Sequence, residues 1–385
     1  HMRTQTSTRR VPRLLLCALA GASTFSQVGT AAVPAPKPTM FISVTGLDNP
    51  TCTRATPCLR FAHVHAIAKP GTIVQVGAGS YSDQTIEPKP EEAGKRIVFQ
   101  RAPGARVEIA GLTVRGSHVE FRNMAIKSWS SKPTASDLRF ENIKNGGFWI
   151  EGSMNVAIIR GSVGPGVDYH PIIGPADRQP PRNIVIDRVF FHDWTRSNSD
   201  VHTECLQVGA ADGLVIRRSR FWNCAVMSLF LSYWGGGPHP RNITIENNYF
   251  DGGRDGGFYS VRFADHAPAF ENVLVRNNSA LAPFSIDTKP ALQNFRVIAN
   301  VAPLPAWGCN GGVIYRYNVW NGARCGPTDA TADPLFRDPA RLDLRLKNGA
   351  RAINRGDPTS FPAVDIDGKK RPFGRRPDAG ANERR

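Results

Sequence analysis

The sequence predicts an all-β fold, a parallel β-helix, on two observations. First, a short phrase that alternates apolar and polar residues returns every 18 to 30 residues through the middle of the chain. Such alternation indicates a strand with one buried face, and each copy is too short to bury that face alone, so the copies must stack as solenoid coils. The clear copies begin at Asn183, Gly213, Asn242, Asn272, Asn294 and Gly312, and weaker copies begin at His118, Asp137 and Asn155. Second, 36 Gly and 30 Pro favour many short strands over long helices.

The repeat also indicates how the chain is divided. A chain of 385 residues is long enough for two or three domains, but no clear linker interrupts the spacing of the phrases. We therefore expect one continuous domain over residues 40–383. Coils of this kind form a long flat sheet, a surface suited to holding an extended polymer.

The first 39 residues are expected to lie outside this domain. Arg9, Arg10 and Arg13 precede an apolar, small-residue stretch from Leu14 to Ala32, which is typical of a secretory signal peptide over residues 1–32. The arginine pair loosely resembles a twin-arginine signal, with an ordinary export signal as the alternative. Residues 33–39 are Pro-rich and predict a stiff leader. No other stretch is long and apolar enough to span a membrane, so we predict a secreted, extracellular protein with no membrane partner.

Cysteine usage agrees with export. Six of the seven cysteines follow the signal peptide, an even number that suggests disulfides. The sequence-local pairing is Cys52–Cys58, Cys205–Cys224 and Cys309–Cys325. The first and last pairs close short turns, whereas the partners of the middle pair could fall on different sides of adjacent coils. No Cys-x-x-Cys pair exists, which disfavours a metal site.

The net charge indicates the class of partner. Removing residues 1–32 removes four arginines and no acids, so the charge falls from +16 to +12. An excess of positive charge favours anionic partners. Nucleic acid is disfavoured because the chain has no recognised nucleic-acid motif and its basic residues are spread out. We expect an acidic polysaccharide as the partner of a monomer, and a generally basic secreted protein is the alternative.

Both ends of the chain carry a family resemblance. The start reads Cys52-Thr-Arg-Ala-Thr-Pro-Cys58 and Lys69-Pro-Gly-Thr-Ile-Val, and the end reads Val364-Asp-Ile-Asp-Gly and continues to Glu383. These segments resemble secreted proteins of the pectate-lyase-like superfamily. The resemblance implies a single-stranded, right-handed parallel β-helix with an N-terminal capping helix at 63–68, a closing segment at 308–383, and turn asparagines at 247–248 and 277–278 that stack in ladders.

The resemblance does not fix an activity. This fold carries lyases, hydrolases, epimerases and non-catalytic binding proteins. The strong catalytic signatures of pectate lyases and polygalacturonases are missing, so no site residue is transferred from them.

A second series of strands lies between the repeat phrases and predicts the working face. If Leu206 and Val208 point inward, the outward row on successive coils is Gln207, Phe230 and Arg262, with neighbours about 4.8 Å apart. Arginine offers a two-pronged match to a carboxylate, so this row suits a polymer of sugar acids.

The segment beside this row holds the densest chemistry of the chain. Asp200, His202 and Glu204 lie just before Leu206, and with Arg262 they are the candidate catalytic residues. Glu204 shares the parity of Leu206, so a regular strand would bury it at a cost. Either it precedes the strand, or it pairs with His202 inside, or a bulge turns it outward. The candidate substrate contacts are Tyr169, His170, Trp194, Arg196, Gln207, Tyr233, Trp234, Asp265 and His266.

These residues suit several reactions on an extracellular, uronate-containing polysaccharide. In a lyase, His202 is the base, Arg262 neutralises the carboxylate, and Tyr233 or Tyr169 protonates the leaving group. No cofactor is firmly indicated; Asp200 and Glu204 are candidate ligands for Ca²⁺.

A glycoside hydrolase is the second reading of the same residues. Its carboxyls must lie about 5–5.5 Å or 6.5–9.5 Å apart, whereas Asp200 and Glu204 would be about 13 Å apart on an extended strand, so Glu204 would need Asp265 or Glu151. A uronate C5-epimerase and a non-catalytic polysaccharide-binding surface protein are also compatible with this segment.

Overall fold

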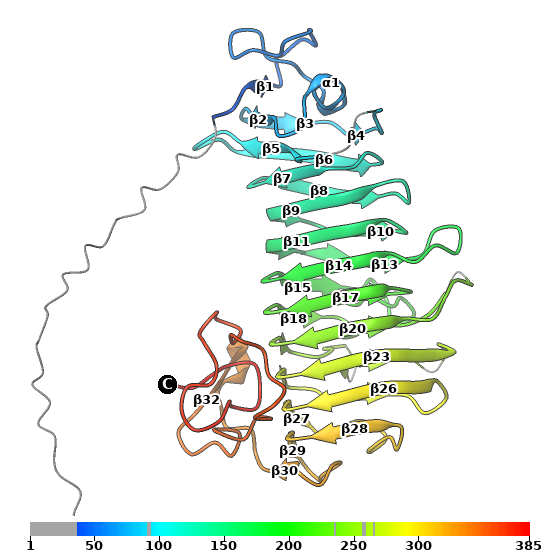
Figure 1. Ribbon diagram of the computed structural model, residues 1–385, viewed down its shortest axis with the longest axis vertical. Coiled ribbons are helices and arrows are strands. Elements are labelled where there is room, and N and C mark those ends of the chain that lie inside the picture. Colours follow the sequence, from blue (N-terminus) through cyan, green and yellow to red (C-terminus); the bar gives the residue numbers. More distant parts are fainter. Residues whose placement is uncertain (1–36, 91–93, 235, 256–258, 265) are drawn as a thin grey trace, which may run out of the picture. The chain divides into compact units, whose positions relative to one another are not determined.

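The structure is a computed structural model that describes residues 37–90, 94–234, 236–255, 259–264 and 266–385. The predicted signal peptide and most of the leader lie outside the described residues. Parallel strands stack coil upon coil along the length of the unit 37–385 (Figure 1). The chain is therefore a parallel β-helix, as the sequence predicted. No helix of the described residues has the length and hydrophobicity needed to cross a membrane.

The parallel strands form three sheets, which we call sheets A, B and C. Sheet A is made of β1 (Met40–Ile42), β2 (Ile73–Val76), β5 (Ile97–Arg101), β7 (Val119–Arg122), β9 (Ser136–Asn145), β11 (Met154–Val163), β14 (Arg182–Asp187), β17 (Asp212–Arg217), β20 (Arg241–Glu246), β23 (Ala269–Arg276), β26 (Ala291–Ile298) and β28 (Val313–Arg316). These strands contain the repeat phrases.

Sheet B follows sheet A in each coil. It is made of β3 (Gly79–Tyr81), the first halves of β6 (Val107–Val114) and β8 (Ala125–Ser131), the ends of β9 and β11, β12 (Gly166–Val167), β15 (Phe190–Thr195), β18 (Arg220–Cys224), β21 (Tyr249–Phe250), β24 (Ser279–Ala280), β27 (Val301–Pro303), β29 (Val319–Asn321) and β30 (Ala330–Thr331).

Sheet C completes the coil. It is made of β4 (Gln84–Ile86), the second halves of β6 and β8, β10 (Phe148–Glu151), β13 (Ile172–Gly174), β16 (Leu206–Val208), β19 (Met227–Leu231), β22 (Tyr259–Phe263) and β25 (Phe284–Ile286).

Identical positions of successive coils stack inside the helix. Phe191, Phe221 and Phe250 are buried, and their ring centroids lie 4.6 and 4.9 Å apart. This separation matches the spacing of hydrogen-bonded strands, so each ring packs on the ring of the next coil.

A buried ladder of asparagines lines the turn between sheets A and B. Nδ2 of Asn248 donates to the amide oxygen of Asn278, that of Asn278 donates to Asn300, and that of Asn300 donates to Asn318, at 3.0–3.1 Å. Asn318 donates to Asp329, where the ladder ends. The expectation that Asn248 and Asn278 stack in a ladder is confirmed.

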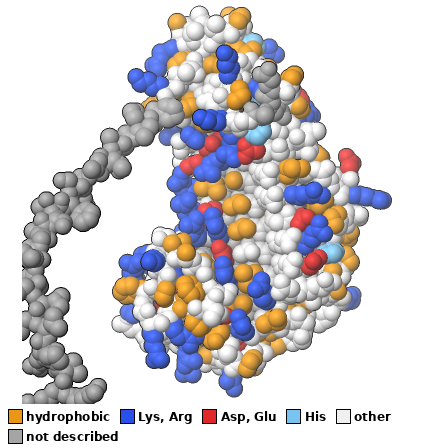
Figure 2. Space-filling view, viewed as in Figure 1, with side chains coloured by type: hydrophobic (Ala, Val, Ile, Leu, Met, Phe, Trp, Pro, Cys, Tyr) orange, Lys and Arg blue, Asp and Glu red, His pale blue; other side chains and the backbone are white. Residues whose placement is uncertain are grey.

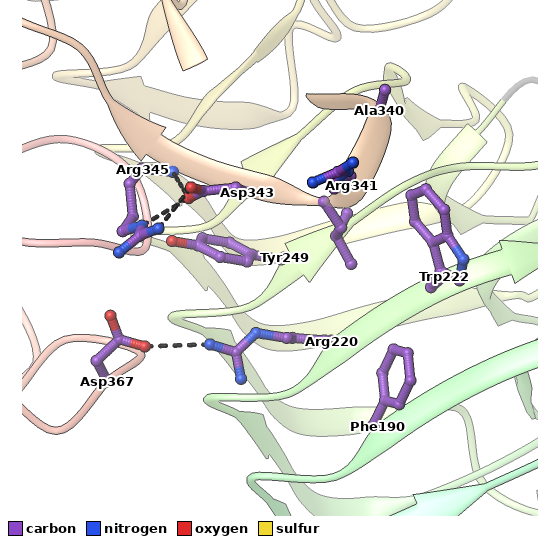
Figure 3. Close-up of a pocket in the computed structure, with 10 residues that line it drawn as sticks. Phe190, Arg220, Trp222, Tyr249, Ala340, Arg341, Asp343, Arg345 and Asp367 are labelled. Atoms are coloured by element: carbon purple, nitrogen blue, oxygen red, sulfur yellow. Dashed lines mark hydrogen bonds and ion pairs between the residues drawn. The ribbon is translucent and has the colours of Figure 1, made fainter. Parts of the chain in front are cut away.

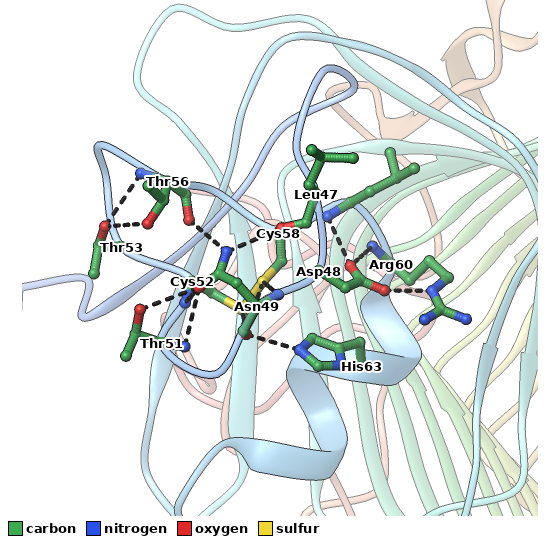
Figure 4. Close-up of a disulfide and its surroundings, with 11 residues drawn as sticks. Leu47, Asp48, Asn49, Thr51, Cys52, Thr53, Thr56, Cys58, Arg60 and His63 are labelled. Carbon is green, nitrogen blue, oxygen red and sulfur yellow. Dashed lines mark hydrogen bonds and ion pairs between the residues drawn. A yellow bond between two sulfur atoms is a disulfide. The ribbon is translucent and has the colours of Figure 1, made fainter.

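The start of the helix is covered by α1 (Phe61–Ile67), close to the predicted cap. Phe61 stacks on Phe99 of the coil below at 5.1 Å. The loop before α1 is closed by the Cys52–Cys58 disulfide, and His63 bonds to the carbonyl of Asn49 beside it (Figure 4). The other two predicted disulfides, Cys205–Cys224 and Cys309–Cys325, are also present.

Beyond β30 the chain turns back along the outside of the coils. This returning segment, residues 332–385, contains β31 (Phe336–Asp338), η1 (Pro339–Arg341) and β32 (Asp343–Leu346). It lies beside β27 and β29, and its apolar side chains form a second core with sheet B (Figure 1).

Much of the positive charge is used within the structure. Figure 2 shows Lys and Arg along the edge of sheet A where its strands end, with acids between them. There Arg218 bonds to Asp187 with Nε at 2.8 Å, and Arg276 bonds to Glu246 at 2.8 Å. These arginines stabilise the stack of coils, so net charge alone overstates how much positive charge is left for a ligand.

Candidate functional site

The outward row predicted for sheet C is present. Gln207 pairs with Phe230, and Phe230 pairs with Arg262. The inward neighbours are buried, and Phe230 is buried as well, in a small outer cluster with Val226 and Met227. The row continues through Ile172 to the exposed Trp149 on one side and through Ser285 to Ala306 on the other. At about 4.8 Å per coil, Trp149 and Ala306 are roughly 29 Å apart, and the row between them is open to solvent only in parts, because Phe230 and Ser285 are buried.

A buried carboxylate lies beside this row. Glu204 is fully buried two residues before β16 begins, which settles an orientation that the parity of the strand had left open. One oxygen, Oε1, lies 3.3 Å from Nδ1 of His202, and the other, Oε2, lies 3.5 Å from Nδ1 of His170. Two of the proposed explanations therefore hold together: Glu204 precedes the regular strand, and it pairs with a histidine.

The carboxylate joins the two histidines to the row. Nε2 of His170 bonds to the side-chain oxygen of Gln207, and Gln207 donates to Ser232 at 3.3 Å. His170 is largely buried in this network. The side chain of His202 is 66% exposed, so His202 is the member of the cluster that a ligand can reach.

The groups around His202 shift its pKa in opposite directions. The hydrogen bond to Glu204 raises the pKa of His202 above its usual value, while partial burial and the nearby guanidinium groups of Arg196 and Arg262 oppose this rise. The cluster therefore holds a histidine of raised pKa among positive charges.

The two arginines are held in place differently. Arg196 donates to the backbone oxygens of Ser199, at 2.8 Å, and Asp255. Arg262 bonds to Asp287 at 2.9 Å and lies over the ring of Phe230, 5.8 Å from its centroid. The ring of His266 lies 6.1 Å from the ring of Phe230, so the predicted contact residue His266 also lies near the row.

A hollow of about 340 Å³ adjoins Arg262 and extends the site beyond the predicted residues. It is lined by Arg262, Asp287, Thr288, Lys289 and Trp307. Trp307 is 78% exposed. The sequence analysis missed Lys289 and Trp307, although both follow the strand positions that continue the outward row, Ser285 and Ala306.

One predicted substrate contact is buried in the core. Trp194 is 1% exposed and its ring packs on Gly164 and Gly166, so it does not reach a substrate. The reason is local: Asp193 has φ +55°, which shifts the alternation of β15 by one residue and turns Trp194 inward. That prediction is corrected.

Three other predicted residues, Asp200, Tyr233 and Trp234, lie apart from the cluster. Asp200 is exposed and bonds only locally, to Ser199 and Asn198. Trp234 is half-buried over Gly174 and Gly209 at the opposite edge of sheet C, and the hydroxyl of Tyr233 donates to the carbonyl of Gly237. Tyr169 is strongly exposed next to His170. Asp265 lies outside the described residues.

The proposed calcium ligands do not fit that ion. Calcium takes six to eight oxygen ligands. Both oxygens of Glu204 face imidazole nitrogens, and Asp200, whose exposed carboxylate accepts from Ser199 at 3.4 Å, is the one remaining acid of the proposed pair. Within the described ranges, the one group of three metal-ligating side chains is Cys52, Cys58 and His63, whose sulfurs form a disulfide. No step of a mechanism is therefore assigned to calcium.

The comparisons with known proteins agree with the fold. No family model and no curated protein matches the chain. A crystal structure of the pectate lyase Pel9A is 14% identical and covers 91% of this chain and 97% of its own, with a TM-score of 0.50. A rhamnogalacturonan lyase is 12% identical, covers 88% and 90%, and has a TM-score of 0.37. The first likeness shows a shared parallel β-helix fold, and the site residues rest on the geometry alone.

Proposed function

We propose that this protein is a secreted polysaccharide lyase that cleaves a uronate-containing polysaccharide by β-elimination, with His202 as the base. The observation that carries the proposal is the buried Glu204 carboxylate between His170 and His202, beside a row that contains Arg262. A carboxylate behind an imidazole orients the ring and stabilises its protonated form.

His202 performs the first half of the reaction. Its Nδ1 bonds to Glu204, which leaves Nε2 to take the proton from the sugar carbon next to the uronate carboxylate. Positive charge near that carboxylate stabilises the negative charge that develops on it. Arg262 and Lys289 supply this charge, and Trp149 and Trp307 offer faces on which sugar rings stack.

The second half of the reaction breaks the glycosidic bond. The electron pair of the broken C–H bond forms a double bond in the ring, the bond to the glycosidic oxygen breaks, and that oxygen takes a proton. We assign Tyr169 as the proton donor, because its side chain is exposed beside His170, whereas the hydroxyl of Tyr233 is engaged with Gly237.

Elimination fits this cluster better than hydrolysis does. A glycoside hydrolase needs a carboxylic acid that reaches the glycosidic oxygen and a second carboxyl at a set distance. Glu204 is fully buried, and Glu151, one of its suggested partners, pairs with Lys132. The other suggested partner, Asp265, lies outside the described residues. Three disulfides support the secreted location.

The test is the ultraviolet absorbance of the unsaturated product during incubation with polygalacturonate, alginate and glucuronan, with and without added Ca²⁺. We expect absorbance to rise with one of these polymers and the rate to fall about 10²–10⁴-fold in His202→Gln. The matched control is His239→Gln, because His239 pairs with Glu271 at 3.2 Å outside the cluster and its loss should leave the rate unchanged.

Different results would contradict the proposal in recognisable ways. New reducing ends without absorbance would indicate a hydrolase. Exchange of a sugar proton with solvent deuterium, without cleavage, would indicate an epimerase. Binding without any reaction would indicate a polysaccharide-binding protein.

A further inference from the structure

A second and larger hollow lies on sheet B, where the returning segment meets the coils (Figure 3). Its volume is about 540 Å³, within the range of small-molecule sites. It is lined by Phe190, Arg220, Trp222, Tyr249, Ala340, Arg341, Leu342, Asp343, Arg345 and Asp367. None of these residues belongs to the proposed active site on sheet C.

The hollow exists because the returning segment covers only part of sheet B. Phe190, Arg220 and Tyr249 occupy the same outward position on three successive coils. The segment buries Tyr249 but leaves Phe190 exposed, and the neighbouring outward residue, Trp222, is half-buried at the edge of the second core. Two aromatic side chains therefore form one wall, and the segment forms the other.

The polar groups of the hollow suit a ligand that both donates and accepts hydrogen bonds. Arg220 bonds to Asp367 at 3.1 Å, and Nε of Arg345 bonds to Asp343 at 2.6 Å. All four side chains remain partly exposed, so each pair offers donors and acceptors at one surface. Sugar hydroxyl groups have the same dual character, and aromatic faces stack on the apolar faces of sugar rings.

Tyr249 adds an unsatisfied group. Its hydroxyl is buried and has no hydrogen-bond partner among the described residues, and it points to the side of Arg345 in Figure 3. A buried hydroxyl without a partner is unfavourable, so a ligand hydroxyl or an ordered water at this point would be stabilised.

One arginine is available for a negative charge. Arg341 is 87% exposed at the rim, and its nearest acid, Asp338, is 3.8 Å away. At this exposure the pair contributes little, so the guanidinium can exchange Asp338 for a carboxylate of the ligand. The hollow thus combines an aromatic wall, paired donors and acceptors, and a cation at its rim.

We propose that this hollow is a second, non-catalytic binding site for an acidic saccharide, in which sugar rings stack on Trp222 and Phe190 and a carboxylate contacts Arg341. The site would hold a polysaccharide at a distance from the row on sheet C. It shares a ligand class with the proposed function, but it does not depend on the chemistry assigned to His202.

Amide hydrogen exchange on the full chain tests the site locally. The chain carries His202→Gln to prevent turnover, and the probes are trigalacturonate and the neutral trisaccharide maltotriose. We expect trigalacturonate to slow exchange in peptides spanning 217–224 and 339–346. Trp222→Ala and, separately, Arg341→Ala should each weaken this protection, because each removes one main contact. We expect the concentration of trigalacturonate that gives half-maximal protection to rise about tenfold.

Matched controls and outcomes keep the test decisive. Phe373→Ala and Arg375→Ala remove an exposed aromatic and an exposed arginine of the same segment outside the hollow, and should leave the protection unchanged. Because Arg341 is at the surface, Arg341→Ala gives an answer even if Trp222→Ala does not fold.

Three results would overturn the inference: protection confined to sheet C, no protection at all, or equal protection by maltotriose. Failure of the proposed lyase reaction is seen separately, as absence of unsaturated product with the unmodified chain.

Discussion

At the residue scale, the chemistry of this protein depends on how one carboxylate is buried. Burial of an unpaired carboxylate is costly, and the hydrogen bond of Oε1 to His202 offsets part of that cost, while Oε2 faces Nδ1 of His170 at 3.5 Å without a hydrogen bond. His170 comes from the coil before, while His202 is only two residues away. The result is an exposed imidazole with a raised pKa and a fixed orientation.

The first prediction concerns Glu204→Gln. Loss of the carboxylate lowers the pKa of His202, because its hydrogen bond to Glu204 is the main cause of the raised pKa. The base must be deprotonated to act, so the pH at which the rate reaches half of its maximum should move down while the maximum falls about a hundredfold. A pH–rate profile of product absorbance measures both, and an unchanged midpoint would contradict the assignment. The control is Glu271→Gln in the separate His239 pair.

The pair of His202 and Glu204 also makes the free energy of unfolding depend on pH. A histidine whose pKa is raised in the folded state stabilises the fold below its unfolded pKa of about 6.5 and loses this contribution as the pH rises through the folded pKa. Urea unfolding from below pH 6 to above pH 8 should therefore show a stability decline that is smaller in Glu204→Gln than in the unmodified chain.

At the element scale, each coil is fixed by alternation along its strands and by the turns between them. Inward aromatic and aliphatic residues set the register that carries Gln207, Phe230 and Arg262 outward in one row. The buried asparagine ladder at the turn between sheets A and B satisfies backbone groups of the turn, as the side-chain oxygen of Asn278 does for the backbone N–H of Asn248. A second ladder, on the exposed face, joins Asn272 to Asn242 at 3.1 Å.

The second prediction compares these two ladders. Asn278→Ala removes an acceptor for both the backbone and the side chain of Asn248, and it removes one donor to the carbonyl of Ile245. Each unsatisfied buried group costs about 1–3 kcal/mol, so we expect the free energy of unfolding to fall by roughly 2–5 kcal/mol. Asn272→Gly keeps the positive φ of +53° at its exposed position and should cost less than about 1 kcal/mol. Urea unfolding measures both variants, and equal losses would contradict the role of the buried ladder.

At the scale of the whole molecule, the returning segment is tied to the coils by a buried ion pair. Arg371 and Glu383 are both fully buried and bond at 2.9 Å. Arg371 also donates to Asn247 at 3.2 Å, in the turn that begins the ladder region. This segment supplies Arg341, Asp343 and Asp367 to the hollow on sheet B, so the proposed saccharide site depends on its docking.

The third prediction is that Glu383→Gln weakens this docking. Removing Glu383 takes the hydrogen-bonded counter-charge from the buried guanidinium of Arg371 and leaves it only the weaker attraction of Asp365 and Asp378, which costs about 3–5 kcal/mol. The exposed pair of Glu87 and Arg115 is the matched control, and Glu87→Gln should cost less than about 1 kcal/mol. Hydrogen exchange should show faster opening of residues 332–385 in Glu383→Gln. Opening confined to other parts of the chain would contradict this role of the pair.

The local pattern of the sequence was enough to predict the parallel β-helix and the row of Gln207, Phe230 and Arg262, while the capping helix was implied by the family resemblance. It was also enough for the three disulfides, because each joins cysteines within 6 to 19 residues of one another. Alternation and short spacing are properties of neighbouring residues, and stacking identical coils repeats them along the molecule. Alternation left the orientation of Glu204 open, because Glu204 precedes the regular strand.

The tertiary structure decided the orientation of Trp194, the grouping of the site residues and the hollow on sheet B. These features depend on turns and on contacts between distant segments. The left-handed conformation of Asp193 turned Trp194 into the core, against its expected role. The fold brought His170 to Glu204, and it placed Lys289 and Trp307 beside Arg262. Arg220 and Asp367, 147 residues apart, meet in the hollow on sheet B because the returning segment docks there. Alternation along a strand carries no information about where such a segment docks.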